Sequence, residues 1–287
     1  MASPDRGRLA LFVGILVAFA VALYVLSRIT ATSPIALAPA YMFSPTISGL
    51  VVCSRGDVPL SAAGLRIGRG RWLAVAATIA LPLVGTTLLI AVAAPGVGFD
   101  PAADPIPGLG LPSGLLGVAA TLGLALGLGA TVNAAFAFGE EFGWRGYLLW
   151  ELAPWGFWRA SAAIGVLWGL WHAPVVVAGY NYPSFPAIGV LAMTVACVSF
   201  SPVYTYLVVR AESVLAAALL HGVFNGSAGL VIAYAVTDDA VLGELLASPV
   251  GAAGVVAFGI AAVGIALAGT PALTRGFAGD AVTSDGG

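Results

Sequence analysis

Six polar side chains stand inside apolar stretches of this sequence, and their types are those that carry acid–base chemistry. The densest group is F-G-E-E-F-G-W-R, residues 138–145, where two adjacent carboxylates and a guanidinium interrupt a hydrophobic run. Each such charge costs about 3 kcal/mol at the centre of a membrane helix, so a chain rarely keeps three without a use. The candidate site residues are Glu140, Glu141, Arg145, His172, His221 and Asn225.

Helical spacing suggests how these groups pair. Glu141 and Arg145 are four residues apart with the acid first, which is the favourable order for an ion pair on one helix face. Glu140 points about 100° away from that face, so the spacing predicts that its carboxylate is left free. His221 and Asn225 are also four residues apart and are expected to share a face.

The composition shows what kind of elements must position these groups. Hydrophobic residues make up 60% of the 287 and charged residues only 8%, whereas soluble domains carry about 25% charge. The sequence therefore predicts an integral, multi-pass membrane protein. The formal net charge is -2, which argues against nucleic acid as a partner. Membrane lipid and a peptide or protein substrate are the partners expected.

Hydrophobic runs predict an all-α, polytopic helical bundle of about eight transmembrane helices, with no soluble domain left over. The chain reads as a single transmembrane domain, 1–287, with three N-terminal spans and loops in 1–112, a catalytic core in 113–236, and the last span and tail in 237–287. The expected spans are 9–26, 34–53, 72–95, 113–152, 157–178, 187–209, 213–235 and 249–268.

Three of these spans are expected to be irregular. Pro39 and Pro45 predict a kink in the second span, and Pro202 predicts one in the sixth. As one straight helix the fourth stretch, 113–152, would be about 60 Å long, twice the hydrocarbon thickness. It must tilt, lie along the interface at one end, or break, and three glycines are the expected break points: Gly139, Gly143 and Gly146.

Gly123 and Gly127 in the same stretch form a small-x-x-x-small pair, which would allow another helix to approach closely.

Arginine asymmetry predicts the orientation. Eight spans place both termini on one side, and nearly all arginines then fall on that side, while the opposite loops are acidic. The positive-inside rule makes the arginine side cytoplasmic, with the cell (cytoplasmic) membrane as the expected location. Counted at about 1.5 Å per residue from that face, Glu140, His172 and His221 all lie about 14 to 21 Å deep, so one shared site is geometrically possible.

At these residues the sequence resembles the CPBP family, which includes the CAAX prenyl proteases of the Ras-converting type and the Abi-type bacteriocin-processing proteases. The family pattern is E-E-x-x-x-R, then an aromatic residue one turn ahead of a His, then H-x-x-x-N. The first motif matches at residues 140–145 and the third at 221–225. The second matches at Trp168 and His172, with Trp where the family more often has Phe. The resemblance covers roughly residues 114–235.

The resemblance implies an intramembrane endopeptidase with a cavity open toward the cytoplasm. By analogy, Glu140 and His172 would activate water, while His221 and Asn225 would donate hydrogen bonds to the developing oxyanion. Arg145, held by Glu141, would keep the site ordered. The substrate would be a peptide or protein, with a prenylated C-terminus as one possibility.

Metal dependence has two interpretations. Two histidines and a glutamate are also the ligands of catalytic zinc sites, so Glu140, His172 and His221 form an alternative zinc site. No H-E-x-x-H helix is present, and we favour a site without any cofactor or metal. One reason is that His221 is expected to pair with Asn225, whereas a ligand histidine usually gains a second-shell acceptor.

Two other function classes fit the same residues. Buried Glu, Arg and His side chains also serve proton-coupled transporters, and a non-catalytic member could bind lipidated peptides. Substitution of the candidate residues separates the three classes, because only a protease loses cleavage.

Overall fold

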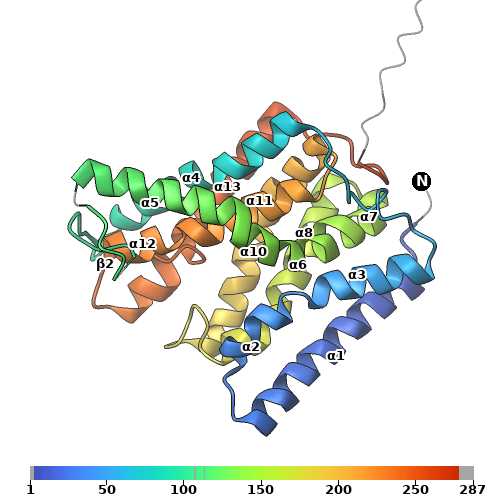
Figure 1. Ribbon diagram of the computed structural model, residues 1–287, viewed down its shortest axis with the longest axis horizontal. Helices are drawn as coiled ribbons and strands as arrows, with labels where there is room; N and C mark the ends of the chain where they lie inside the picture. The colour runs from blue at the N-terminus through green and yellow to red at the C-terminus, as the bar shows by residue number, and fades with distance from the viewer. Residues whose placement is uncertain (1–2, 107, 113, 278–287) are drawn as a thin grey trace, which may run out of the picture.

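The computed structural model describes residues 3–106, 108–112 and 114–277, and over these residues the protein is a bundle of packed helices (Figure 1). Seven helical segments are long and apolar enough to cross a membrane. The predicted all-α, multi-pass bundle is therefore confirmed. The segments are Arg6–Thr30 (α1), Pro34–Arg55 (α2 and α3), Gly70–Val92 (α4), Leu116–Trp155, Phe157–Val177 (α8 and α9), Pro186–Ala211 (α10) and Leu215–Tyr234 (α11 and α12).

The eighth predicted span corresponds to a shorter helix. α13 covers Ala252–Ala268, and its 17 residues rise about 25 Å, somewhat less than the hydrocarbon thickness of a bilayer. It packs against α10 and α4. Two outer loops meet in a short antiparallel pair of strands, β1 (Gly98–Phe99) with β2 (Ala235–Val236).

The second span is interrupted, as its prolines predict. α2 covers Pro34–Tyr41, and α3 begins two residues later and covers Ser44–Arg55. Pro45 stands in the first turn of α3, where its missing N–H is tolerated. In the sixth span, by contrast, α10 continues as one helix through Pro202.

Of the three alternatives for the fourth stretch, a break at the glycines does not occur, although a π-helical turn spans Gly143 and Gly146. It is helical from residue 114 to 155, and the departures from regular α-helix are two π-helical turns, η1 and η2. Ser113, where the span was predicted to begin, lies outside the described residues. The glycines serve close packing instead. A Cβ on Gly143 would lie 2.3 Å from the carbonyl oxygen of Pro45, and one on Gly146 would lie 2.9 Å from that of Ala63. The helical pieces are α5 (Gly114–Leu128), η1 (Gly129–Asn133), α6 (Ala134–Glu141), η2 (Phe142–Leu148), α7 (Leu149–Leu152) and the 3-10 turn η3 (Ala153–Trp155).

The predicted close-contact pair of glycines is wrong, although the packing device is present elsewhere. A Cβ added at Gly123 or Gly127 would meet no atom within 4 Å. Gly165 and Gly169 on α8 (Phe157–Trp171) have the same spacing, and Cβ atoms there would lie 2.6 and 2.3 Å from Cα atoms of α10. The small residues therefore bring α8 and α10 together, on either side of the candidate site.

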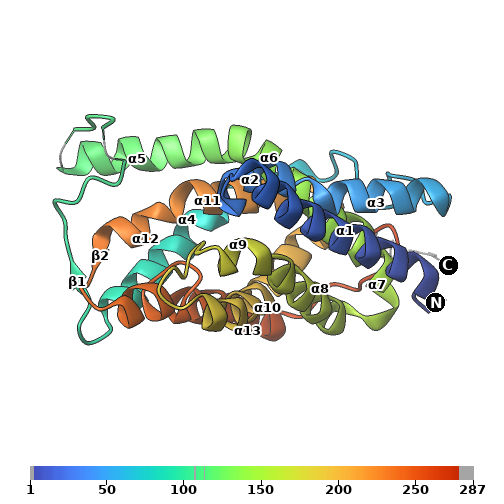
Figure 2. The ribbon, with the colours of Figure 1, turned by 90° about the horizontal axis from the view of Figure 1, so that it is seen from below.

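The two ends of the described chain, near residues 3 and 277, lie together at one end of the molecule (Figure 2). Arg275 donates to the carbonyl of Ser3 over 3.5 Å, and Arg66 donates to the carbonyl of Gly276. Arg66 also donates to the backbone carbonyl of Glu212. The arginine-rich segments thus gather at one end, and the β1–β2 pair lies at the other. Which end faces the cytoplasm remains a prediction.

A buried glutamate at the end of the fourth span is the centre of a cluster that we call the terminal clasp. It consists of Glu151, Arg8, Arg275 and the backbone N–H of Asp5. Glu151 is fully buried and accepts hydrogen bonds from Arg8 Nε at 2.6 Å, Arg275 Nη2 at 3.1 Å and Asp5 N at 2.8 Å. Both guanidinium groups also lie over the Trp150 ring. The clasp joins the two ends of the described chain to the end of the fourth span.

Candidate active site

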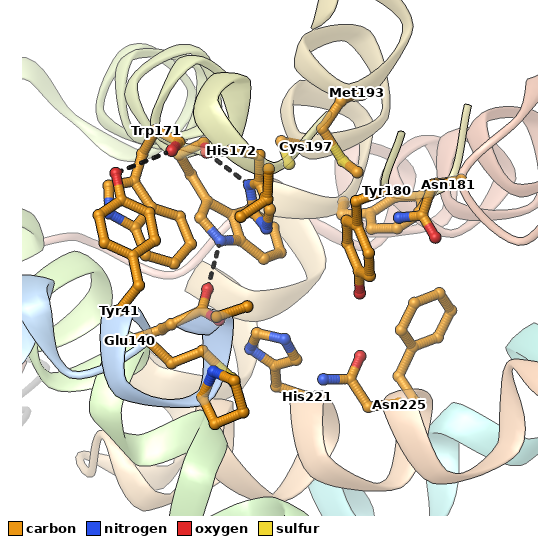
Figure 3. A pocket seen from close by; sticks show the side chains of 18 of the residues that line it. Tyr41, Glu140, Trp171, His172, Tyr180, Asn181, Met193, Cys197, His221 and Asn225 are labelled. Atoms are coloured by element: carbon orange, nitrogen blue, oxygen red, sulfur yellow. Dashed lines mark hydrogen bonds between the residues drawn. The ribbon is translucent and has the colours of Figure 1, made fainter. Parts of the chain in front are cut away.

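Four of the six candidate residues line one cavity of about 240 Å³. They are Glu140, His172, His221 and Asn225, and they come from three segments far apart in sequence (Figure 3). The remaining wall is largely apolar, built from aliphatic, aromatic and sulfur-containing side chains. Glu141 and Arg145 do not line this cavity; they lie behind its wall, fully buried.

Glu140 is held by the indole of Trp168. The ring N–H of Trp168 donates to Glu140 Oε2 over 2.8 Å, and Glu140 is only 3% exposed. The prediction that this carboxylate has no partner is therefore wrong. An ionised carboxylate has about four acceptor sites, so one bond fixes its direction and leaves the group able to hold water.

His172 stands at a helix interruption. It ends α8 and precedes α9 (Ala173–Val177), and Pro174 follows, whose ring nitrogen cannot donate to the carbonyl of Leu170. The Nδ1 of His172 lies 2.8 Å from the carbonyl oxygen of Trp168. Since a carbonyl only accepts, Nδ1 must carry the proton, and in the neutral ring Nε2 then offers a lone pair.

Glu141 joins the arginine and the second histidine. Arg145 Nη1 donates to both oxygens of Glu141 at 3.1 Å, so the predicted i,i+4 pair is present. His221 Nδ1 lies 2.8 Å from Glu141 Oε1. All three residues are at most 5% exposed, and the carboxylate thus faces two positive or proton-donating partners away from water.

Two aromatic rings enclose the Arg145 guanidinium. Its central carbon lies 4.2 Å from the centroid of the Trp168 ring and 4.6 Å from that of Tyr204. Its Nη2 also donates to the Ser201 hydroxyl over 3.1 Å. Such stacking suits arginine because the planar guanidinium is more weakly hydrated than an ammonium group. Trp168 therefore touches both the arginine and Glu140, and links the buried pair to the cavity.

The expected pairing of His221 with Asn225 does not occur. Within the described chain His221 bonds to Glu141, while Asn225 is exposed to the cavity one turn farther along α11 (Leu215–Ser227). Helix α11 is brought in by close backbone contact: a Cβ on Gly222 would lie 2.4 Å from the carbonyl oxygen of Gly129 in η1. With Nδ1 protonated toward Glu141, the His221 ring presents a lone pair at Nε2 when it is neutral and a second N–H donor when it is doubly protonated.

This bonding bears on the zinc alternative at Glu140, His172 and His221. Both histidines have their Nδ1 atoms held by acceptors, as ligand histidines do, so the argument against metal from a His221–Asn225 pair fails. Over the described residues, no three His, Cys, Asp or Glu side chains form a group able to hold a metal ion. The donor types suit zinc, and whether the site uses a metal stays a prediction.

Several residues of the site were not expected from the sequence. Trp168 was expected only as the aromatic residue one turn ahead of His172, and the roles of Ser201 and Tyr204 were missed. The signal was present in S-F-S-P-V-Y-T-Y, residues 199–206, because five hydroxyl groups within one membrane span call for hydrogen-bond or stacking partners. Tyr180 and Asn181, in the loop after α9, also line the cavity.

Comparison with known proteins places this site in context. Residues 115–227 match the family described as Type II CAAX prenyl endopeptidase Rce1-like, and the match includes all six candidate residues. It confirms the resemblance to the CPBP and CAAX protease family. It supports a CAAX protease-like hydrolase embedded in the membrane, with a peptide in the membrane as substrate. No functionally curated protein matches the chain.

Proposed function

We propose that this protein, given the Rce1-like match of its residues 115–227, is an intramembrane endopeptidase in which Glu140 and His172 activate water. The observation that carries the proposal is the shared cavity, in which a held carboxylate, two histidines and a carboxamide face one space. Acid–base chemistry of this type contributes about 10²–10⁴-fold to a rate, provided that the groups are positioned in advance.

Glu140 and His172 act together on the attacking water: Glu140 accepts its proton, and His172 accepts a hydrogen bond from it. The Trp168 indole fixes Glu140 from one side, and the Trp168 carbonyl fixes the His172 ring. One residue thus orients both groups. A water molecule between them donates one proton to the Glu140 carboxylate and the other as a hydrogen bond to His172 Nε2, which leaves its oxygen lone pair directed at the substrate.

The reaction that we propose is hydrolysis of a peptide bond by this water. Water oxygen bonds to the carbonyl carbon, its proton passes to Glu140, and the carbonyl π electrons move to oxygen. The oxyanion then collapses, the C–N bond breaks, and the amine nitrogen takes the proton back from Glu140. A carboxylic acid and an amine are released, and the base is regenerated.

The cavity walls indicate the class of peptide. Apart from the polar groups already named, the lining is apolar, with Met42, Val175, Met193, Phe200 and Phe224 among its members. An extended segment with apolar side chains, or one carrying a prenyl chain, loses little solvation on leaving the lipid for such a space. A membrane-embedded peptide, prenylated in the special case, is the substrate that we propose.

Comparison of membrane proteomes tests this function. Cells that carry Glu140→Gln in place of the wild type should accumulate one or more uncleaved precursors, because glutamine keeps the shape but not the base. Matched cells carrying Asp238→Asn, the same change of carboxylate to amide at an exposed loop residue away from the cavity, serve as the control. Identical proteomes in all three strains would refute the protease assignment.

The metal-free mechanism needs its own measurement. Elemental analysis of active, detergent-purified protein should give less than one zinc per chain, and cleavage should survive exhaustive chelation. One zinc per chain that is lost together with activity, and restored with it, would replace this mechanism by a zinc-dependent one.

A further inference from the structure

The loop between α9 and α10 forms one wall of the cavity. Tyr180 and Asn181 both line it, together with the four candidate residues (Figure 3). The Tyr180 hydroxyl points into the cavity, toward the space above His221 and Asn225. Tyr180 is 40% exposed as a residue, although protein atoms crowd around its hydroxyl.

The loop is fixed by contacts on its far side. Tyr182 is fully buried, and its hydroxyl donates to the Val250 carbonyl over 2.7 Å. A Cβ on Gly189 would lie 2.6 Å from Tyr182, so only glycine lets this side chain seat against α10. Ser184 donates its backbone N–H and its hydroxyl to the Glu244 carboxylate. These bonds anchor the loop that carries Tyr180.

The proposed reaction lacks a donor that this loop can supply. An oxyanion in a peptidase is usually stabilised by two or more donors. His221 directs its Nδ1 proton at Glu141, so its ring can offer a proton to the cavity only when it is doubly protonated, from Nε2. On that wall, Asn225 is the donor that needs no change of protonation. The Tyr180 hydroxyl reaches the same space from the opposite side.

We propose that Tyr180 is a further catalytic residue, whose hydroxyl donates a hydrogen bond to the oxyanion that forms at the scissile carbonyl. The inference rests on the proposed peptidase function. No proton is transferred in this step: the phenol keeps its proton, and the hydrogen bond strengthens as charge moves to the carbonyl oxygen. Asn225 donates from the other side.

The titration of the phenol agrees with this role. Burial raises the pKa of Tyr180 above its ordinary value, the Glu140 charge acts in the same direction, and a hydrogen bond with Asn181 opposes them. The phenol therefore remains protonated at neutral pH and can donate.

Tyr180→Phe tests the inference, because it removes one hydroxyl and keeps the ring. The probe is an internally quenched peptide that carries the cleavage site of the precursor accumulated by Glu140→Gln cells, assayed with enzyme in lipid vesicles. We expect kcat to fall by about 10–100-fold with KM changed less than about 2-fold, because the bond forms in the transition state. The unfolding midpoint should equal that of the wild type. Tyr24→Phe, which removes a hydroxyl from an exposed side chain on α1, should change neither constant.

Each other result has a separate meaning. Wild-type kcat in Tyr180→Phe, or a raised KM with kcat unchanged, would overturn the catalytic role. A lower unfolding midpoint that accounts for the lost activity would do the same. Failure of the wild type to cleave any precursor would instead refute the proposed function, so the two failures are distinguishable.

Discussion

Two fully buried glutamates lie ten residues apart on the same helical stretch, and their surroundings differ. Glu151 accepts from two arginines and a backbone N–H, and no candidate residue lies beside it. Glu141 accepts from Arg145 and His221, and its neighbour Glu140 faces a cavity. A carboxylate surrounded by donors can only hold structure together. One that borders an open space, with bases fixed nearby, can also serve chemistry.

The largest expected difference is in cleavage. Glu140→Gln should lower the rate of peptide cleavage by about 10²–10⁴-fold, since it removes the base. Glu151→Gln should leave the rate within about 2-fold of the wild type. Initial rates in lipid vesicles, at equal amounts of folded protein, measure both. Comparable losses of cleavage rate in the two variants would show that the cavity and the terminal clasp do not differ in their role in catalysis.

Stability should show the reverse order for the neighbouring carboxylates. Glu141→Ala leaves Arg145 buried without its counter-charge, which costs about 3–5 kcal/mol. Glu140→Ala removes one hydrogen bond from Trp168, which costs about 1–2 kcal/mol. Unfolding in detergent, followed by tryptophan fluorescence, compares the two. Equal midpoints would mean that the Glu141–Arg145 pair has no structural role.

The helix between the two glutamates offers a third test. Gly143→Ala should destabilise the fold by about 1–3 kcal/mol, because the new methyl group would overlap the Pro45 carbonyl. Gly123→Ala is the matched control, and it should be neutral or stabilise by up to about 1 kcal/mol, since alanine favours helix and nothing lies near. If both variants unfold at the wild-type midpoint, the close approach of α3 is not required.

Glu151→Gln should have a moderate effect on stability. Its arginine partners have side chains that are 25% and 27% exposed, so water compensates part of the lost attraction. We expect a loss of about 1–2 kcal/mol, smaller than for Glu141. High salt should reduce the difference from the wild type. A loss of stability as large as that of Glu141→Ala would mean that water does not compensate for the broken Glu151–arginine pairs.

The last prediction concerns orientation in the membrane and involves no change in activity or stability. In a Cys53→Ala, Cys197→Ala background, Ser61→Cys lies near the arginine-rich end and Ala102→Cys lies in the opposite loop. A membrane-impermeant thiol reagent should label only Ala102→Cys on intact cells, and both after lysis. Labelling of Ser61→Cys alone would invert the orientation.

The sequence predicted the spans and the identities of the cavity residues better than their partners. Hydropathy and helical spacing are local properties, so the eight apolar runs and the Glu141–Arg145 pair could be placed from them. The bond from Trp168 to Glu140 depends on how two distant helices face each other, which periodicity does not determine. The glycines at helix contacts could not be predicted for the same reason. The sequence of an apolar helix does not show which face packs against a neighbour, so Gly123 and Gly127 were predicted where Gly165 and Gly169 make the contact.

The terminal clasp also has a consequence for the order of synthesis. Ribosomes deliver the chain from its N-terminus, so Arg8 is in the membrane when Glu151 arrives, but Arg275 follows 124 residues after it. Until then the carboxylate has only half of its guanidinium partners, and the end of the fourth span is incompletely neutralised. The clasp can therefore close only after the chain beyond α13 has been made. The end of the fourth span then receives its last counter-charge from a residue near the other end of the described chain.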